Sequence, residues 1–144
     1  MKRRLPGLAQ SAQPQDEVPD GIYLVRVQRF QYRWDKTKSC YALRLVVEEP
    51  KALAGRVLSG RLYCTERALW KLSWFLRDFG YDSEMLGRDE LDEKQVLGAH
   101  GVVKLSHTRL DGRSYANFDG FAAAARWEEL GSEWASRSSD QEVA

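Results

Sequence analysis

Residues 19–47 read PDGIYLVRVQRFQYRWDKTKSCYALRLVV, and this stretch decides the fold. It opens with the turn-forming residues Pro, Asp and Gly and then alternates apolar with polar side chains, which is the period of a half-buried β-strand. A first strand is therefore predicted from Ile22 to about Trp34. Its alternating positions are Tyr23, Val25 and Val27 on one side and Arg26, Gln28 and Phe30 on the other.

Two further strands are predicted downstream. A polar loop over residues 35–39 leads into a second strand over residues 41–47, which has one apolar face. That face is made of Tyr41, Leu43, Leu45 and Val47. Gly55 and Arg56 then open a third strand from Val57 to Cys64, which is rich in β-branched, aromatic and small residues.

The next segment has the spacing of a helix. Thr65 is a suitable N-cap, and Gly80 supplies a left-handed stop, so one long helix is predicted to end at Phe79 or Gly80. An apolar stripe recurs at intervals of three and four residues and consists of Leu69, Leu72, Leu76 and Phe79. The acidic residues 82–96 have few apolar anchors and are predicted to form a loop with room for one short turn.

The last predicted unit is a hairpin. Residues 102–107 resume β-character, Asp111-Gly112 suits a tight turn, and a return strand is predicted from Tyr115 to Phe121. Three strands, one helix and then a two-stranded hairpin is the order of the five-stranded Greek-key barrel called the oligonucleotide-binding (OB) fold. We therefore expect an all-β protein that forms one small closed barrel, with one long helix between strands three and four. The interior is expected to hold Tyr41, Val103, Leu105 and Phe118.

The length and composition predict one globular domain. The chain has 144 residues, of which 43% are hydrophobic. Residues 1–18 are expected to be a disordered arm, residues 19–126 the OB domain, and residues 127–144 a flexible, mildly acidic tail. The sequence has neither an apolar signal core nor a membrane-length apolar run, so we expect a soluble, cytoplasmic protein without a membrane partner. Cys40 and Cys64 are expected to be free, buried thiols, and no metal site or other cofactor is expected.

The net charge of +1 conceals a strong segregation of charge. Residues 19–65 carry nine basic and four acidic side chains, a net charge of +5. Residues 81–100 and residues 127–144 each carry a net charge of −4. The first half of the predicted barrel is therefore cationic, which favours an anionic ligand there.

In an OB fold, oligonucleotides bind across strands two and three, between the loop that joins strands one and two and the loop that joins strands four and five. Both loops are basic here, and cations on phosphates supply most sequence-independent affinity for nucleic acid. The candidate cations are Arg33, Lys36, Lys38, Arg44, Arg61, Lys104, Arg109 and Arg113, with His107 beside them.

Unpaired bases also stack on aromatic rings. The candidate stacking residues are Tyr32, Trp34, Tyr63 and Tyr115, although barrel tyrosines fill the core about as often. Trp70 and Trp74 lie four residues apart on the predicted helix, and we expect both to pack against the protein because an exposed Trp is costly.

An enzyme is the least favoured class. His100 and His107 have no Cys or carboxylate at ligand spacing, and the sequence contains no glycine-rich phosphate loop and no nucleophile motif. A protein-interaction adaptor built on the same barrel is the main alternative to a nucleic-acid binder, because a fold alone does not determine a function.

From Val18 to about Phe121 the chain resembles a family of small phage and prophage proteins that are similar to single-stranded DNA-binding proteins with an OB fold. The resemblance is carried by PDGIY at 19–23, KTKS at 36–39, GR at 55–56, and TERALWKL at 65–72 running into Leu76 and Gly80. It implies non-specific binding of single-stranded DNA in phage or prophage replication, recombination or repair. For such a binding module, the mildly acidic tail is expected to recruit replication, recombination or repair proteins, or to compete with DNA for the groove. A homodimer through an edge strand is a further expectation.

Overall fold

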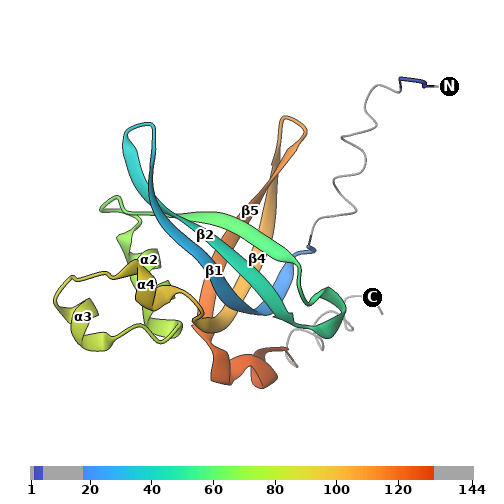
Figure 1. Cartoon of the computed structure of the whole chain (residues 1–144). Coiled ribbons are helices and arrows are strands. Elements are labelled where there is room, and N and C mark those ends of the chain that lie inside the picture. The colour runs from blue at the N-terminus through green and yellow to red at the C-terminus, as the bar shows by residue number, and fades with distance from the viewer. Residues whose placement is uncertain (1, 5–17, 132–144) are drawn as a thin grey trace.

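The computed structural model describes residues 2–4 and 18–131, and its main feature is one five-stranded antiparallel sheet (Figure 1). The strands are β1 (Gly21–Asp35), β2 (Lys38–Glu49), β3 (Val57–Tyr63), β4 (His100–Leu110) and β5 (Arg113–Ala123). Their order across the sheet is β3-β2-β1-β4-β5. The prediction of a mostly β protein with five strands is confirmed.

The prediction of a closed barrel is wrong, because the backbone hydrogen bonds of the sheet do not close into a ring. β3 and β5 are its two edges, and no ladder joins them. They approach through side chains instead: a Cβ placed on Gly60 of β3 would lie 2.5 Å from the Cε2 atom of Phe118 of β5. The Phe118 ring therefore lies against the β3 backbone. The seam between the edge strands β3 and β5 is thus closed by side-chain packing and not by backbone hydrogen bonds.

A β-bulge in β1 changes which side chains face the core. The register of β1 against β2 shifts between Val27 and Arg29, so that Gln28 is the extra residue. Val27 and Phe30 are both buried as a result, although they are three residues apart. The prediction that Phe30 lies opposite Tyr23, Val25 and Val27 is wrong for this reason.

Two hairpins project from the same end of the sheet (Figure 1). The predicted loop over residues 35–39 is only a two-residue turn, because Asp35 pairs with Lys38 and Lys36 takes a positive φ of 58°. The predicted turn at Asp111 and Gly112 is confirmed, with φ angles of 53° and 76° that match a type I′ turn.

The helix after β3 is short, so the prediction of one long helix from Thr65 is wrong. Helix α2 (Leu69–Asp78) begins four residues later, and the carbonyl of Thr65 accepts hydrogen bonds from the N–H groups of Ala68 and Leu69. Ala68 is the N-cap residue of the helix, and no side-chain hydrogen bond caps it. The helix packs on the sheet through Phe75, which is fully buried, and through Phe79, which lies against Gly101 of β4.

The acidic segment over residues 82–96 holds two helices rather than a loop. These are α3 (Ser83–Gly87) and α4 (Glu93–Val96). Asp82 and Asp92 cap them, because each carboxylate accepts a hydrogen bond from the N–H group two residues further along the chain. Short 3-10 helices follow β2 (Lys51–Leu53) and β5 (Ala124–Arg126).

The core lies between the inner face of the sheet and α2. Tyr41, Val103, Leu105 and Phe118 are buried, as predicted. Of the predicted apolar stripe of the helix, Leu69 is exposed and the other members are buried. Trp74 packs edge-on against Phe121, as predicted. The prediction that Trp70 also packs against the protein is wrong, because its side chain is 62% exposed and, among the described residues, its ring stacks on Trp74 alone.

Several predictions concern the ends of the domain and the thiols. Val18, which the sequence places in the N-terminal arm, is buried in the core. Residues 5–17 of that arm and residues 132–144 of the acidic tail lie outside the described residues. Cys40 is a buried free thiol, and Cys64 is free but only partly buried. In the described part of the chain, no helix has the length and apolar character to cross a membrane.

Candidate nucleic-acid interface

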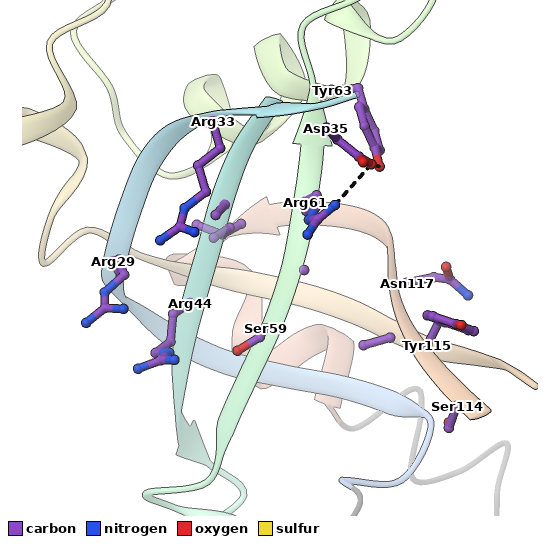
Figure 2. A pocket seen from close by; sticks show the side chains of 14 residues that line it. Arg29, Arg33, Asp35, Arg44, Ser59, Arg61, Tyr63, Ser114, Tyr115 and Asn117 are labelled. Carbon is purple, nitrogen blue, oxygen red and sulfur yellow. Dashed lines mark hydrogen bonds and ion pairs between the residues drawn. The ribbon is translucent and has the colours of Figure 1, made fainter. Parts of the chain in front are cut away.

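A groove of about 760 Å³ lies on the outer face of β1, β2 and β3 and is bounded on one side by β5 (Figure 2). Four arginines and one acid line it, together with tyrosine, serine and asparagine side chains. These residues are Arg29, Arg33, Asp35, Arg44, Ser59, Arg61, Tyr63, Ser114, Tyr115 and Asn117. The groove is thus strongly cationic in a protein whose net charge is +1.

The strand register sets the arginines in rows across the sheet. Arg29 of β1 lies opposite Arg44 of β2, which in turn lies opposite Ser59 of β3. In the part of the chain that the structure describes, no carboxylate pairs with Arg29 or Arg44. Two guanidinium groups therefore face each other across the ladder without a counter-charge, an arrangement that is unfavourable until an anion binds between them.

The bulge at Gln28 is the reason that β1 contributes to this groove. Without the extra residue, strict alternation from Val27 would direct Arg29 toward the core and Phe30 toward solvent. Because of the extra residue, Arg29 and Arg33 share the outer face with Arg44. Arg33 is held in place by a hydrogen bond that its Nη2 donates to Gln31 Oε1 over 2.9 Å.

Asp35 joins two of the lining residues at one end of the groove. Its Oδ2 accepts a hydrogen bond from the hydroxyl of Tyr63 over 2.8 Å and lies 3.0 Å from Nη1 of Arg61 (Figure 2). The Tyr63 hydrogen bond and, to a smaller extent, the charge of Arg61 lower the pKa of Asp35 from its usual value. The same hydrogen bond raises the pKa of Tyr63, so the hydroxyl keeps its proton at neutral pH.

The wall formed by β5 offers polar groups and one aromatic ring. Ser114, Tyr115 and Asn117 lie across the groove from Arg29, Arg33 and Arg44 in Figure 2. Tyr115 is 47% exposed, and Asn117 donates a hydrogen bond to the hydroxyl of Thr108. A ligand in the groove would therefore meet cations on the β1–β2 side and an aromatic face on the β5 side.

The groove gathers five of the residues named from the sequence, namely Arg33, Arg44, Arg61, Tyr63 and Tyr115. The others lie elsewhere. Lys36 is in the β1–β2 turn, and Lys38 begins β2 at the same tip. Arg109 and Arg113 lie at the tip of the β4–β5 hairpin, and Lys104 lies within β4, opposite Ile22 of β1. His107 does not line the groove, and its Nδ1 lies 2.7 Å from Oδ1 of Asp20.

Trp34 and Tyr32 are on the opposite face of β1 from the groove. Adjacent residues of a strand point to opposite faces, so Trp34 cannot share a face with Arg33. The two rings line a second, open hollow together with Phe30, Gln31, Arg33 and Glu93. Arg33 lines both hollows and so marks the rim between them. We call this second hollow the aromatic shelf.

Five lining residues were not predicted from the sequence, namely Arg29, Asp35, Ser59, Ser114 and Asn117. Arg29 could not be found from alternation, because the bulge reverses its face. Asp35 carried a usable signal: it is the only acid between Gly21 and Val47, within a run of six cations. Such a lone acid in a basic stretch is a candidate for pairing with one of those cations.

The groove has no feature of a metal centre. Among residues 2–4 and 18–131, no group of three or more His, Cys, Asp or Glu side chains is arranged to hold a metal ion. Comparison with models of known protein families gives no match for this chain, and comparison with curated protein sequences gives none either. The function of this protein is therefore inferred from the geometry of the two hollows.

Proposed function

We propose that this protein binds single-stranded DNA, without strong sequence preference and without catalysis, in the groove between β1–β3 and β5. The observation that carries the proposal is the directly opposed pair Arg29 and Arg44, which has no carboxylate partner among the described residues, with Arg33 and Arg61 beside it. Cations that repel one another in the free protein gain most from an anionic ligand. A chain of phosphates meets several of them at once.

The aromatic content of the groove favours a single strand over a duplex. Tyr115, which is 47% exposed, and Tyr63, which is half-buried, both line the groove, and unpaired bases offer flat faces for stacking on such rings. In a duplex, those faces are covered by neighbouring bases. A groove with arginines on one side and a tyrosine on the other thus combines the two requirements of single-strand binding.

The topology supports the further proposal that the sheet is of the OB type. The OB fold is a partly open five-stranded Greek-key barrel whose binding face is strands two and three. The strand order β3-β2-β1-β4-β5, the helix between β3 and β4, and the contact of Phe118 with Gly60 at the seam are consistent with such a barrel. With the resemblance noted above, this favours a role in phage or prophage DNA replication, recombination or repair.

The proposal is tested by the fluorescence anisotropy of a labelled oligo-dT of about 30 nucleotides, titrated with the protein at several salt concentrations. Binding that weakens steeply between about 50 and 200 mM salt is expected, because each neutralised phosphate releases counterions. The matching duplex should bind more weakly under the same conditions.

A matched pair of variants separates groove binding from general charge. Arg44→Gln removes a groove cation, whereas Arg77→Gln removes an exposed cation on α2, outside the groove. The first should weaken binding, and the second should leave it nearly unchanged. Absence of binding to oligo-dT at low salt would refute the proposal and direct attention to protein partners.

A further inference from the structure

The aromatic shelf has the geometry of a site for one flat, apolar ring. Trp34 is 66% exposed and Tyr32 is 49% exposed, and their rings are nearly perpendicular, with centroids 6.3 Å apart. An exposed patch of adjoining aromatic rings is typical of a ligand-binding surface. A planar group that stacks on Trp34 would meet Tyr32 at the corner of the shelf, so that two of its sides are covered.

The shelf is held rigidly from below. Tyr32 packs edge-on against Tyr41, which stacks in parallel on Phe30 with 4.2 Å between ring centroids. The hydroxyl of Tyr41 donates a hydrogen bond to Oε1 of Glu93 over 3.1 Å. Burial, with the neighbouring Glu93 charge, raises the pKa of Tyr41, so the hydroxyl remains a donor and keeps Glu93 in place.

Glu93 brings a hydrogen-bond acceptor to the shelf. Its side chain lines the hollow beside Tyr32 and Trp34, and Oε1 is engaged by Tyr41. In the described ranges, Glu93 takes part in no ion pair, and its second oxygen accepts no hydrogen bond. A carboxylate oxygen accepts from amino groups and is repelled by carbonyl oxygens.

We infer that the aromatic shelf is a subsite for one nucleobase and that Glu93 selects bases with an exocyclic amino group at the edge facing it. This inference rests on the proposed binding of single-stranded DNA, because Arg33 lines both hollows and so connects the shelf to the groove. A DNA strand in the groove passes one base across the rim at Arg33 and onto Trp34. Phosphates stay on the arginine side, and the base edge reaches the acid.

Cytosine and uracil are the sharpest pair of probes. They have the same ring size and similar stacking, but cytosine presents an amino donor where uracil presents a carbonyl acceptor. Uracil also lacks the methyl group of thymine, which would complicate a comparison on an apolar shelf. Glu93 therefore favours oligo-dC over oligo-dU, by about fivefold for one partly exposed charge-assisted hydrogen bond per bound strand.

The experiment measures anisotropy with labelled oligo-dC and oligo-dU of equal length for the full chain and three variants. Glu93→Gln keeps an acceptor for Tyr41 but offers both a donor and an acceptor to the base, so the preference for dC should fall to about one. Glu84→Gln removes the same charge from an exposed position on α3 outside both hollows and should keep the preference. Trp34→Ala should weaken both oligonucleotides and abolish the preference. Thermal melting verifies that each variant is folded.

The failures of the two proposals are distinguishable. Salt-sensitive and equal binding of dC and dU by the unmodified chain overturns the inference and leaves the proposed function standing. A preference that survives in Glu93→Gln, or affinities that Trp34→Ala does not change, also overturn it. Absence of binding to both oligonucleotides at low salt overturns the inference together with the proposed function.

Discussion

Replacing Arg44 with glutamine is expected to weaken DNA binding while making the fold slightly more stable. Arg44 lies directly opposite Arg29 in the β1–β2 ladder, and the structure shows no acid beside either within the described residues. Like charges directly opposite each other cost about 0.2 to 1 kcal/mol. An independent estimate agrees, since two unit charges about 6 Å apart in water repel by about 0.7 kcal/mol before salt screening.

The gain in stability should therefore be small but measurable. A release of about 0.5 kcal/mol corresponds to a rise of about 1 to 3 °C in Tm for a domain of this size. It should be largest at low ionic strength and fade as salt screens the two guanidinium groups. Arg29→Gln should have the same effect, and the double variant should gain less than the sum, because one repulsion is removed in both cases.

The effect on binding has the opposite sign. Losing one phosphate contact reduces the slope of log K against log salt by about 0.7 for a single strand. We expect the affinity at low salt to fall by about fivefold, which corresponds to about 1 kcal/mol. Thermal melting and anisotropy at four or more salt concentrations measure the two quantities on the same preparation, with Arg77→Gln as the control.

An Arg44→Gln variant that changes in stability but not in DNA binding would contradict a phosphate contact of Arg44. If Arg44→Gln lowers Tm and leaves the salt slope intact, Arg44 supports the fold and does not meet phosphate. If neither the Tm nor the salt slope changes, the Arg44 guanidinium is solvated in both the free and the DNA-bound protein and contributes to neither. Only a raised Tm with a reduced salt slope agrees with an arginine pair that is strained in the free protein and relieved by DNA.

Three further outcomes are expected. Asp35→Asn should strengthen DNA binding several-fold in anisotropy, because it removes the acid from the groove. Folding lowers the pKa of Asp35, so the stability that this carboxylate contributes is present above its usual pKa of 3.8 and is lost as the pH falls below it. The difference in Tm between the unmodified protein and Asp35→Asn should therefore shrink below that pH. Gly60→Ala should destabilise the fold by about 1 to 3 kcal/mol in chemical denaturation, because the new Cβ overlaps a ring of β5, whereas Gly87→Ala, which meets nothing within 4 Å, should not. Trp74→Ala should lower the free energy of unfolding by about 2 to 3 kcal/mol, and Trp70→Ala by less than about 1 kcal/mol. Equal losses would contradict the exposed position of Trp70.

Much of the fold could be predicted because local patterns agree with the final structure. The alternation in β2 places Tyr41 in the core, and the Asp111-Gly112 pair has the backbone freedom that its turn requires. The helix start was predicted wrongly, because the N-cap residue is Ala68 and the chain makes a turn before Leu69. The acidic segment was also misread, although Asp82 and Asp92 had the side chains of N-caps.

The candidate site was predictable in its chemistry and less so in its arrangement. Arg44, Arg61 and Tyr63 could be assigned to one face because β2 and β3 alternate regularly. Trp34 was grouped with Arg33 because both lie next to the predicted loop between strands one and two, but β1 continues through both residues and directs them to opposite faces. The pairing of Arg61 with Asp35 depends on register, which the sequence of one strand does not reveal.

The sequence by itself determined which segments form the strands, the concentration of cations in residues 19–65 and the short turn between β4 and β5. These features depend on side-chain type and on neighbours along the chain. The tertiary structure alone decided which cations meet. The bulge at Gln28 reverses the face of Arg29, and the register of β1 against β2 sets that side chain opposite Arg44. Contacts between residues far apart in the chain depend on pairing and packing, and a shift of one residue exchanges the two faces of a strand.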